Sequence, residues 1–387
     1  MSSLNTVLNE LLQIVPRYKF ESLVSTYQND RYIKYYTTWQ QFITLLYAQM
    51  KGKDSLRDII TSLNTHKAAW YHMGLQDIHR STISDANRSR SYEVYEKLFY
   101  AILNKTKDVT PKHKFRFKNP LYSIDATVID LCLSMYPWAK FRKTKGALKL
   151  HYQYDHSGSI PSFLVVTDAK HHETKVVKEE AFPLLPDSIV SVDRGYIDYN
   201  WLNSLNNKGV FFVTRAKSNI NYSVIGQQDV ERKKGLLFDQ TIRLTGFYTS
   251  KKYPNQLRLV GYQDPEKGKE LIFLTNNFKL SAFTITQIYK SRWQIELFFK
   301  WIKQNLKIKS FLGTNKNAVL TQIWVAMCYY LLLAYIKYQT KYAKSLTELT
   351  RILSEAVFFK VSIIDLLSIN QYNLHKLNKL DHQLALF

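Results

Sequence analysis

The sequence predicts an α/β protein in which a mixed sheet flanked by helices follows an all-helical N-terminal region. Two observations predict this class. Residues 1–110 space their apolar side chains three and four positions apart, as amphipathic helices do. Residues 121–217 then read as three strands followed by alternating helices and strands. A β-rich insertion at 217–277 and a helical tail at 338–387 complete the predicted architecture.

The composition indicates a folded chain with a polyanionic partner. The 387 residues are 45% hydrophobic, and 54 Lys and Arg outnumber 31 Asp and Glu, for a net charge of +23. Such an excess favours nucleic acid, because each neutralised phosphate releases condensed counterions. Residues 1–110 hold only 14 of the basic and 10 of the acidic residues. Most of the positive charge therefore lies beyond residue 110, although a lysine-rich solvated surface is the alternative.

The N-terminal region, residues 1–110, reads as helices at 6–15, 37–52, 55–66 and 91–105. Between the last two, a Ser/Thr-capped segment carries Arg80, Arg88 and Arg90. It is either the second helix of a DNA-binding helix-turn-helix or a basic surface helix. A basic linker bracketed by Pro111 and Pro120 lacks helical periodicity, so we place the domain boundary there.

The second region is predicted as a short meander followed by alternation. Strands are expected at 121–134, 146–156, 160–169, 188–193 and 210–217, with helices at 173–185 and 197–209, the latter ending on Gly209. The insertion contains the alternating runs 240–248, 256–263 and 270–276. The core therefore comprises residues 118–216 and 278–337.

Cysteine usage and hydropathy favour a reducing cytoplasm. Cys132 and Cys328 stand in apolar surroundings without CxxC spacing, which argues against a disulfide framework or a zinc knuckle. Residues 318–336 are uncharged and nearly long enough to cross a bilayer, but Thr, Gln and Tyr dilute them and no second span exists. We expect a buried helix, no membrane partner, and a cytoplasmic protein associated with the nucleoid.

The stretch 288–313 contains one acid, Glu296, among six basic residues. At about 100° per residue, one helical face of about 80° holds a Tyr, an Arg, the Glu and two Lys. The apolar residues of the same helix adjoin this face and are expected to pack on the core. Read alone, Glu296 and Lys300 are an ordinary surface ion pair. The polar face comprises Tyr289, Arg292, Glu296, Lys300 and Lys303.

Two further acids stand on apolar strands. Asp125 interrupts the first strand in SIDAT, and Asp193 ends the fourth strand in VDRGY, where side chains enter the crevice outside a sheet. Each alone is more often a turn or cap residue. Together with Glu296 they would repel one another unless a cation is present, and oxygen-only ligation suits Mg²⁺ or Mn²⁺. Two such ions per site can promote phosphodiester attack.

The spacing Tyr289-x2-Arg292-x3-Glu296-x6-Lys303 resembles the Y-R-E-K signature of bacterial insertion-sequence DDE transposases of the IS-four family. Asp125 and Asp193 look like the first two acids of that family, and Leu274 to Asn276 like its LTN motif. The resemblance covers about residues 118–335. It implies a ribonuclease H-like core and cut-and-paste transposition by metal-dependent cleavage and strand transfer.

The resemblance also assigns roles. Asp125, Asp193 and Glu296 would be catalytic and would hold two Mg²⁺ or Mn²⁺ ions, while Tyr289, Arg292, Lys300 and Lys303 would grip phosphates. The partners would be double-stranded DNA, as element ends and target, and a second copy in a synaptic homodimer. Hairpin formation is the least secure expectation, because the family does not share it evenly.

Other basic residues are candidate DNA contacts. Arg194 follows the second acid, Arg215 and Lys217 end the strand 210–217, and Lys149 belongs to the basic run 140–149. For Arg215 and Lys217, a solvated strand end is an equal alternative. Two other functions stay open on the sequence: a structure-specific nuclease without strand transfer, and a non-catalytic domesticated DNA-binding protein, which would be expected to lose an acid.

Overall fold

The structure is a computed structural model that describes residues 5–142, 145–169, 173–179, 182–265 and 268–368. Contacts divide the chain into two compact units, Met1–Thr110 with Trp301–Phe387, and Pro111–Lys300. The division falls inside one helix, α12 (Trp293–Asn305). The first and last segments of the chain thus form a helical unit, whereas the middle segment contains the whole sheet.

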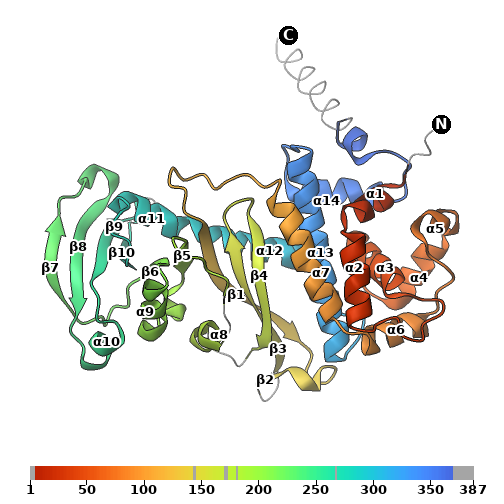
Figure 1. Cartoon of the computed structure of the whole chain (residues 1–387), viewed down its shortest axis with the longest axis horizontal. Helices are drawn as coiled ribbons and strands as arrows, with labels where there is room; N and C mark the ends of the chain where they lie inside the picture. Colours follow the sequence, from red (N-terminus) through yellow and green to blue (C-terminus); the bar gives the residue numbers. More distant parts are fainter. Residues whose placement is uncertain (1–4, 143–144, 170–172, 180–181, 266–267, 369–387) are drawn as a thin grey trace, which may run out of the picture. The chain divides into compact units, whose positions relative to one another are not determined.

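The helical unit is built around α13 (Lys316–Gln339), which contacts α7, α3, α6 and α14 (Figure 1). By length and composition α13 could cross a membrane, but 94% of its most apolar window is buried inside the protein. The predicted buried helix is thereby confirmed. The other helices are α1 (Val7–Ile14), α2 (Arg17–Thr26), α3 (Thr38–Met50), α4 (Leu56–Asn64), α5 (Lys67–Met73), α6 (Arg80–Ser89), α7 (Glu93–Lys107) and α14 (Leu346–Glu355).

The four helices predicted in residues 1–110 are all present, and their ends have identifiable causes. Thr37 and Gln40 form a capping box that satisfies the first backbone donors of α3. Two helices, α2 and α5, were not predicted. α2 buries only Phe20 and Leu23, so its sequence lacks a wide apolar stripe.

The predicted helix-turn-helix segment does form a helix, α6, but two details of that prediction are wrong. Its N-cap is His79, whose side chain makes no capping hydrogen bond, so the helix is not Ser/Thr-capped. Arg90 is 6% exposed and donates to Gln41 Oε1 and the Tyr36 carbonyl oxygen. A guanidinium buried in this way fixes the fold and is not available to DNA.

The second unit is built on one ten-stranded sheet, in the order β2-β3-β1-β5-β6-β10-β9-β8-β7 with β4 paired to β3. β1, β5 and β6 are parallel, and β3 runs antiparallel to β1. The strands are β1 (Leu121–Leu131), β2 (Lys140–Arg142), β3 (Lys145–Asp155), β4 (Ile160–Asp168), β5 (Ile189–Val192), β6 (Phe211–Arg215), β7 (Tyr222–Gln228), β8 (Leu236–Leu244), β9 (Leu257–Gln263) and β10 (Glu270–Thr275).

The β-rich segment continues the central sheet, because β10 pairs antiparallel with β6. The LTN motif explains this junction. Thr275 Oγ1 donates to the Phe212 carbonyl at 2.5 Å, and Asn276 accepts from Phe212 N at 2.9 Å while donating to the Val210 carbonyl at 3.0 Å. One predicted run is too long, since β8 ends at Leu244 and residues 247–252 form the short helix α10 (Phe247–Lys252).

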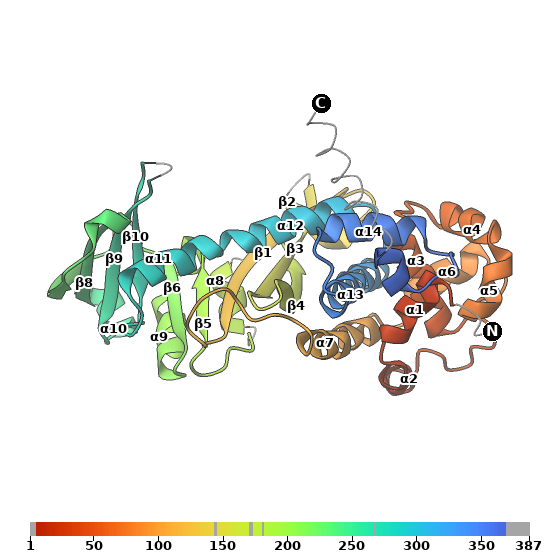
Figure 2. The same ribbon diagram turned by 90° about the horizontal axis from the view of Figure 1, so that it is seen from above.

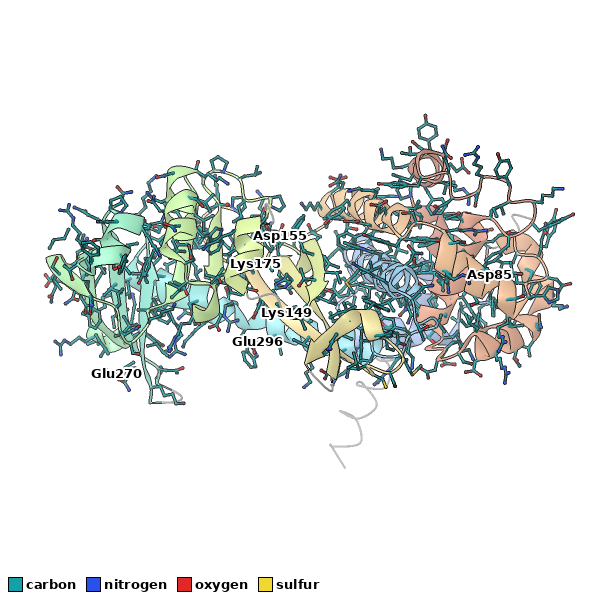
Figure 3. All side chains as sticks on the ribbon, turned by 90° about the horizontal axis from the view of Figure 1, so that it is seen from below. Asp85, Lys149, Asp155, Lys175, Glu270 and Glu296 are labelled. Carbon is teal, nitrogen blue, oxygen red and sulfur yellow. The ribbon has the colours of Figure 1, made fainter. Side chains whose placement is uncertain are left out.

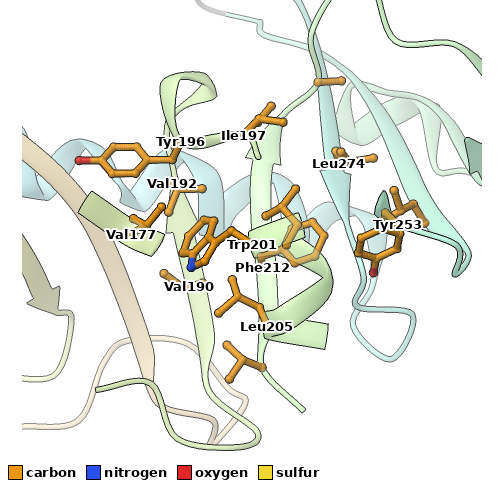
Figure 4. Close-up of a cluster of buried hydrophobic side chains, with 14 of the residues drawn as sticks. Val177, Val190, Val192, Tyr196, Ile197, Trp201, Leu205, Phe212, Tyr253 and Leu274 are labelled. Atoms are coloured by element: carbon orange, nitrogen blue, oxygen red, sulfur yellow. The ribbon is translucent and has the colours of Figure 1, made fainter. Parts of the chain in front are cut away.

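Apolar side chains cover both faces of the sheet, and different helices seal them. On one face α8 (Glu173–Glu179), α9 (Tyr199–Asn207) and α10 lie over a core that includes Trp201, Phe212 and Tyr253 (Figure 4). On the other face α11 (Ala282–Ser291) packs through Ile285 and Ile288. Figure 2 shows α9 and α11 on opposite sides of β6. Strand periodicity therefore decides which residues face α11.

Two further expectations differ from the structure. Cys132 is exposed rather than surrounded by apolar groups, because it lies just after β1; Cys328 is buried, and both are free. The predicted core range 278–337 includes α13, but contacts group α13 with α7 and α3 in the helical unit. Apolar composition predicted that this helix is buried, but composition does not report which partners bury it.

Arg258 of β9 links the sheet to the segment that leads into α11. Its guanidinium donates to both carboxylate oxygens of Asp239 at 2.8 and 2.7 Å and to the carbonyls of Asn277 and Leu280 at 3.0 and 2.6 Å. Both side chains of the ion pair are almost completely buried. The pair therefore fixes where α11 begins.

Replacement of Arg258 by Ala should destabilise the protein by about 3–5 kcal/mol, because it leaves the Asp239 carboxylate buried without a counter-charge. Urea unfolding followed by circular dichroism measures the loss. Arg17→Ala is the control, since its pair with Glu21 is about half exposed and should change stability by less than about 1 kcal/mol. Equal losses in both variants would contradict the structural role of Arg258.

Candidate active site

Asp125 and Asp193 lie side by side because their strands are parallel neighbours. The β1–β5 register pairs Ile124 with Val192, so the next residues along are the two acids. Leu121 and Ile189 belong to the core beneath α11, whereas Ile124 and Val192 belong to the opposite core. Because successive side chains alternate between faces, both acids point to the α11 face.

β6 adds a basic residue to this row. It pairs in parallel with β5, with Ser191 opposite Val213, and two residues further the same register brings Arg215 beside Asp193. Arg215 is half-buried and close enough for its charge to act on Tyr289. Asp125 of β1, Asp193 after β5 and Arg215 at the end of β6 thus lie in a row across three neighbouring strands.

The helical stretch that carries Tyr289, Arg292 and Glu296 is interrupted at Arg292. α11 ends at Ser291 and α12 begins at Trp293, while Arg292 keeps α-helical dihedral angles and bonds back to Tyr289 O. The expected uninterrupted helix is therefore wrong by one residue. Glu296 still follows Arg292 on the same side, as their ion pair requires.

Arg292 connects two of the three acids. Its Nη1 donates to Asp125 Oδ2 at 2.8 Å, and its Nη2 donates to Glu296 Oε1 at 2.9 Å. The Arg292 side chain is only 12% exposed, and its Nε has no hydrogen-bond partner. Glu296 therefore pairs with Arg292 rather than with Lys300, which the sequence made the alternative partner.

Tyr289 connects the third acid. Its hydroxyl donates to Asp193 Oδ1 at 3.3 Å, and its ring packs on Phe273 of β10. Burial raises the pKa of Tyr289, so the phenol stays protonated and acts as a donor. The Tyr289–Asp193 pair and the Asp125–Arg292–Glu296 group are neighbours and together make up one cluster, because the Arg292 guanidinium lies 5.6 Å from the centroid of the Tyr289 ring.

α12 is held on the sheet by its apolar side. Ile295 and Phe299 are buried as predicted, together with Ile302 and Leu306 further along the helix. Phe298 and Phe299 pack against Tyr152 of β3, with ring centroids 5.2 and 5.6 Å apart. Tyr152 lies opposite Asp125 in the β1–β3 register. The helix that carries Glu296 is thus fixed directly over the strand that carries Asp125.

Burial raises the pKa of Asp125 to about 6. The Arg292 charge and the Ala126 N–H, which donates to Oδ1 at 2.8 Å, act in the opposite direction. The neighbouring charges of Asp193 and Glu296 are smaller causes that act in the same direction as burial. All three carboxylates therefore interact electrostatically, and Arg292 only partly relieves their repulsion.

The arrangement differs from the predicted direct convergence of three carboxylates. Among the residues that the structure describes, no three or more His, Cys, Asp or Glu side chains form a group that could hold a metal ion. The physical reason is Arg292, whose guanidinium lies between Asp125 and Glu296. The donor set still fits a hard divalent cation, since it consists of carboxylate oxygens alone. Binding one would require Arg292 to release them.

The remaining candidate residues are dispersed around this cluster. Arg194 is half-buried in the turn after Asp193, and Lys217 Nζ donates to the Ile197 carbonyl at 3.4 Å. On α12, Lys300 is exposed and Lys303 is half-buried. Figure 3 marks Glu296 on α12 and Lys149 on β3.

Lys149 lies on the opposite face of the sheet from the acid cluster. It pairs with Val128, three residues beyond Asp125 along β1. Gln153 lies four residues after Lys149 on β3 and therefore on the same face, and its side chain donates to the Pro183 carbonyl at 3.4 Å on the α8 side. The sequence did not show which face of the sheet Lys149 occupies, because a shift of one residue in the pairing of β3 with β1 would move its side chain to the other face.

Comparison with known proteins bears on this cluster. The family of transposase DDE domains matches residues 116–332, and a domain of unknown function matches residues 3–76. A Sinorhizobium fredii protein named as transposase y4zB is 34% identical over 255 residues, which cover 65% of this chain and 69% of that protein. A Geobacillus stearothermophilus protein named as the transposase of insertion sequence element IS5377 is 29% identical over 276 residues, or 69% and 70% of the two chains.

Two more distant likenesses were found. A Synechocystis protein named as a transposase for insertion sequence element IS4SA is 23% identical over 292 residues, or 73% of this chain and 79% of that protein. Among solved structures, the piggyBac transposase synaptic complex with hairpin DNA aligns at a TM-score of 0.45 and 9% identity, covering 94% of this chain and 79% of that chain.

Replacing Asp125 by Asn should stabilise the protein at alkaline pH. The folded-state pKa of about 6 lies above the ordinary carboxyl value of 3.8. The folded protein therefore holds this proton more tightly than the unfolded chain, and the stability that the proton contributes is present at low pH and lost as the pH rises through 6. The gain should reach at most about 3 kcal/mol at pH 8 and vanish near pH 4. Thermal unfolding across this range measures it, with exposed Asp130→Asn as control. A gain independent of pH would contradict the account.

Replacing Arg292 by Gln should lower the free energy of unfolding by about 2–4 kcal/mol, because it leaves Asp125 and Glu296 without a counter-charge. Arg292→Lys should recover only part of the loss, since an ammonium lacks the fork that reaches both carboxylates. Chemical denaturation provides the values. Arg88→Gln, which removes an exposed pair with Asp85, should cost less than about 1 kcal/mol. A neutral Arg292→Gln would refute the bridge.

Proposed function

The chain belongs to the family of transposase DDE domains, and on this premise we propose that Asp125, Asp193 and Glu296 are its catalytic carboxylates. It is a DDE transposase, an enzyme that cleaves DNA and transfers DNA strands. We further assign it to the IS-four group of insertion-sequence transposases, with Tyr289, Arg292, Glu296 and Lys303 as the Y-R-E-K residues. The adjacency of Asp125 and Asp193 on parallel strands, with Arg292 joining Asp125 to Glu296, carries the assignment.

We propose that the sheet contains a ribonuclease H-like core. The order β4-β3-β1-β5-β6, with β3 antiparallel and β1, β5 and β6 parallel, supports this. The functional domain would comprise residues 118–216 and 278–337, interrupted by the β-rich insertion at 217–277, and its last helix, α13, belongs to the helical unit. Residues 1–110 would bind DNA. The predicted helical tail, residues 338–387, includes α14, and its residues 369–387 lie outside the described residues.

The three carboxylates would hold two Mg²⁺ or Mn²⁺ ions. When bound, such ions activate a water or a 3′-hydroxyl and stabilise the leaving oxygen of a phosphodiester. The protein contributes rigidity: Asp125 lies in the middle of a paired strand, Asp193 directly after another, and Glu296 on a helix packed on the sheet. Their positions are therefore set by the core rather than by a loop.

The basic residues around the acids would hold the phosphates of the cleaved strand. Once separated from the carboxylates, Arg292 can present its planar fork to phosphate oxygens, and Tyr289 can donate from its hydroxyl. Exposed Lys300 and half-buried Lys303 continue this role along α12. Arg215, Arg194 and Lys217 would position the backbone at the strand ends. Lys149 would contact DNA only on the opposite face.

The substrate would be double-stranded DNA, first as the ends of the mobile element and then as the target. The net charge of +23 supports a polyanionic partner. A synaptic homodimer would bring two ends together. A cleavage assay that resolves its DNA products shows directly whether the released end passes through a hairpin.

Glu296→Gln should lower cleavage of duplex DNA that carries the sequences flanking the gene by about a thousandfold or more, a loss of about 4 kcal/mol of transition-state stabilisation. The same variant should still bind that DNA. Cleavage with Mg²⁺ is followed on denaturing gels, with exposed Glu231→Gln as a matched control. Cleavage by Glu296→Gln at the wild-type rate would overturn the assignment. A second assay supplies pre-cleaved ends to the wild-type protein. A transposase joins these ends to target DNA, whereas a nuclease gives no joined product.

A further inference from the structure

We propose that residues 17–19 and 31–35, named here the α2 surface, form the face of the helical unit that binds double-stranded DNA. The proposal rests on the proposed function, since it supposes that the enzyme acts on DNA. It assigns a DNA contact to α2 and to the loop between α2 and α3. This location differs from the α6 segment that the sequence analysis considered.

The α2 surface exposes large aromatic side chains in an unusual concentration. Tyr18, Tyr32 and Tyr35 are 87%, 86% and 77% exposed. The run 31–35, which reads Arg-Tyr-Ile-Lys-Tyr, is exposed throughout. Clustered exposed rings mark interaction sites more often than solvated surface. A tyrosine suits DNA, because its ring packs on deoxyribose while its hydroxyl donates to phosphate.

The charge of the same surface is positive. Arg17, Lys19, Arg31 and Lys34 supply four basic groups, and the two acids nearby are already engaged. Glu21 accepts from Arg17 Nε at 2.7 Å. Asp30 Oδ1 accepts from the Thr38 N–H at 2.7 Å and from its hydroxyl at 2.6 Å, at the start of α3. Phosphate is the partner that matches basic groups interleaved with tyrosines.

The loop that carries residues 31–35 is anchored on both sides. Before it, the Asn29 side chain donates to Ser91 O at 3.1 Å and accepts from Ser91 N at 2.9 Å. After it, buried Arg90 donates to the Tyr36 carbonyl. Within it, Tyr32 has a φ of +61°, a conformation that costs energy for a residue with a Cβ. A held, strained and exposed loop is preorganised for binding.

A depression of about 710 Å³ adjoins the loop and offers room for a DNA strand. It is lined by the apolar side chains of Phe20, Val24 and Trp39, by the basic Arg17 and Arg31, and by the acidic Glu21 and Asp30. The Arg17 guanidinium stacks over the Trp39 ring, 3.9 Å from its centroid. The stacking places the Arg17 cation beside the apolar Trp39 ring. A deoxyribose could pack on the ring while its phosphate contacts the cation.

The α6 surface has a similar charge but no exposed tyrosines. Arg57, Arg80 and Ser84 line a second depression together with Asp54 and Asp85. Its basic groups also include Arg88, paired with Asp85 at 3.0 Å, and Lys307, paired with Asp54 at 2.8 Å. Residues 54–57 and 80–90 contain no aromatic side chain. Because the α2 surface interleaves its basic groups with exposed rings, it is the better DNA site of the two.

The test measures duplex binding by the full-length chain, using fluorescence anisotropy of a labelled 30-base-pair DNA between 50 and 300 mM salt. Arg31→Gln with Lys34→Gln should weaken binding about tenfold and reduce the slope of log K against log salt by about two. Tyr32→Ala with Tyr35→Ala should weaken binding similarly with an unchanged slope. Tyr71→Ala, 89% exposed on α5, is the control and should bind as the wild type.

Three results would overturn the proposal: wild-type binding by both double variants, the tenfold loss in Arg80→Gln with Arg88→Gln instead, or a loss of self-association in the tyrosine variant without a change in DNA binding. Thermal unfolding confirms that each variant folds. The proposed function is tested by a different experiment. If the proposed function is wrong, Glu296→Gln still cleaves DNA. If the α2 surface binds DNA as proposed, its variants bind DNA weakly but cleave it at the wild-type rate once protein saturates the DNA.

Discussion

The fork of Arg292 between Asp125 and Glu296 is the interaction on which the geometry of the site depends. It joins the middle of a strand to a helix through bonds of 2.8 and 2.9 Å, in a place where the guanidinium is 12% exposed. An ion pair at this depth contributes to position more than to stability, because desolvation offsets much of the attraction. Removing Arg292 would nevertheless leave the charges of Asp125 and Glu296 uncompensated.

The same contact explains how the site can be both stable and reactive. Burial is the main cause of the raised pKa of Asp125, and repulsion by the carboxylates of Asp193 and Glu296 acts in the same direction. One monovalent cation offsets this repulsion only in part. Under the proposed function, divalent cations would replace Arg292 between the carboxylates, and the released guanidinium would contact a phosphate. This exchange of cations would link the resting protein to DNA chemistry.

The sequence predicted the helices and strands more accurately than it predicted which elements pack against one another. Asp193 at a strand end and Glu296 on a helix with an apolar side were predictable, because strand and helix periodicities are local. That α13 packs on α3 and α7 was not predictable, since burial of a helix does not name its partners. Lys149 lies on the far face for a similar reason: one residue of register, set by pairing with β1, decides its direction.

Local signals also missed the break at Arg292 and the α2 surface. The break separates two helices by a single residue that keeps helical angles, so no proline or glycine announces it. The α2 surface did have a signal, the run Arg-Tyr-Ile-Lys-Tyr, but exposure of its tyrosines depends on anchors 62 and 54 residues away. Such anchors belong to tertiary structure.

The central claim is that Asp125, Asp193 and Glu296 exchange the Arg292 cation for divalent metal when DNA is present. Anomalous X-ray diffraction from crystals grown with duplex DNA and Mn²⁺ tests it most directly. The account predicts manganese peaks bounded by these three carboxylates, with Arg292 detached from Asp125 and turned to a phosphate. Manganese bound elsewhere, or an intact bridge between Arg292 and both acids in the DNA complex, would contradict it.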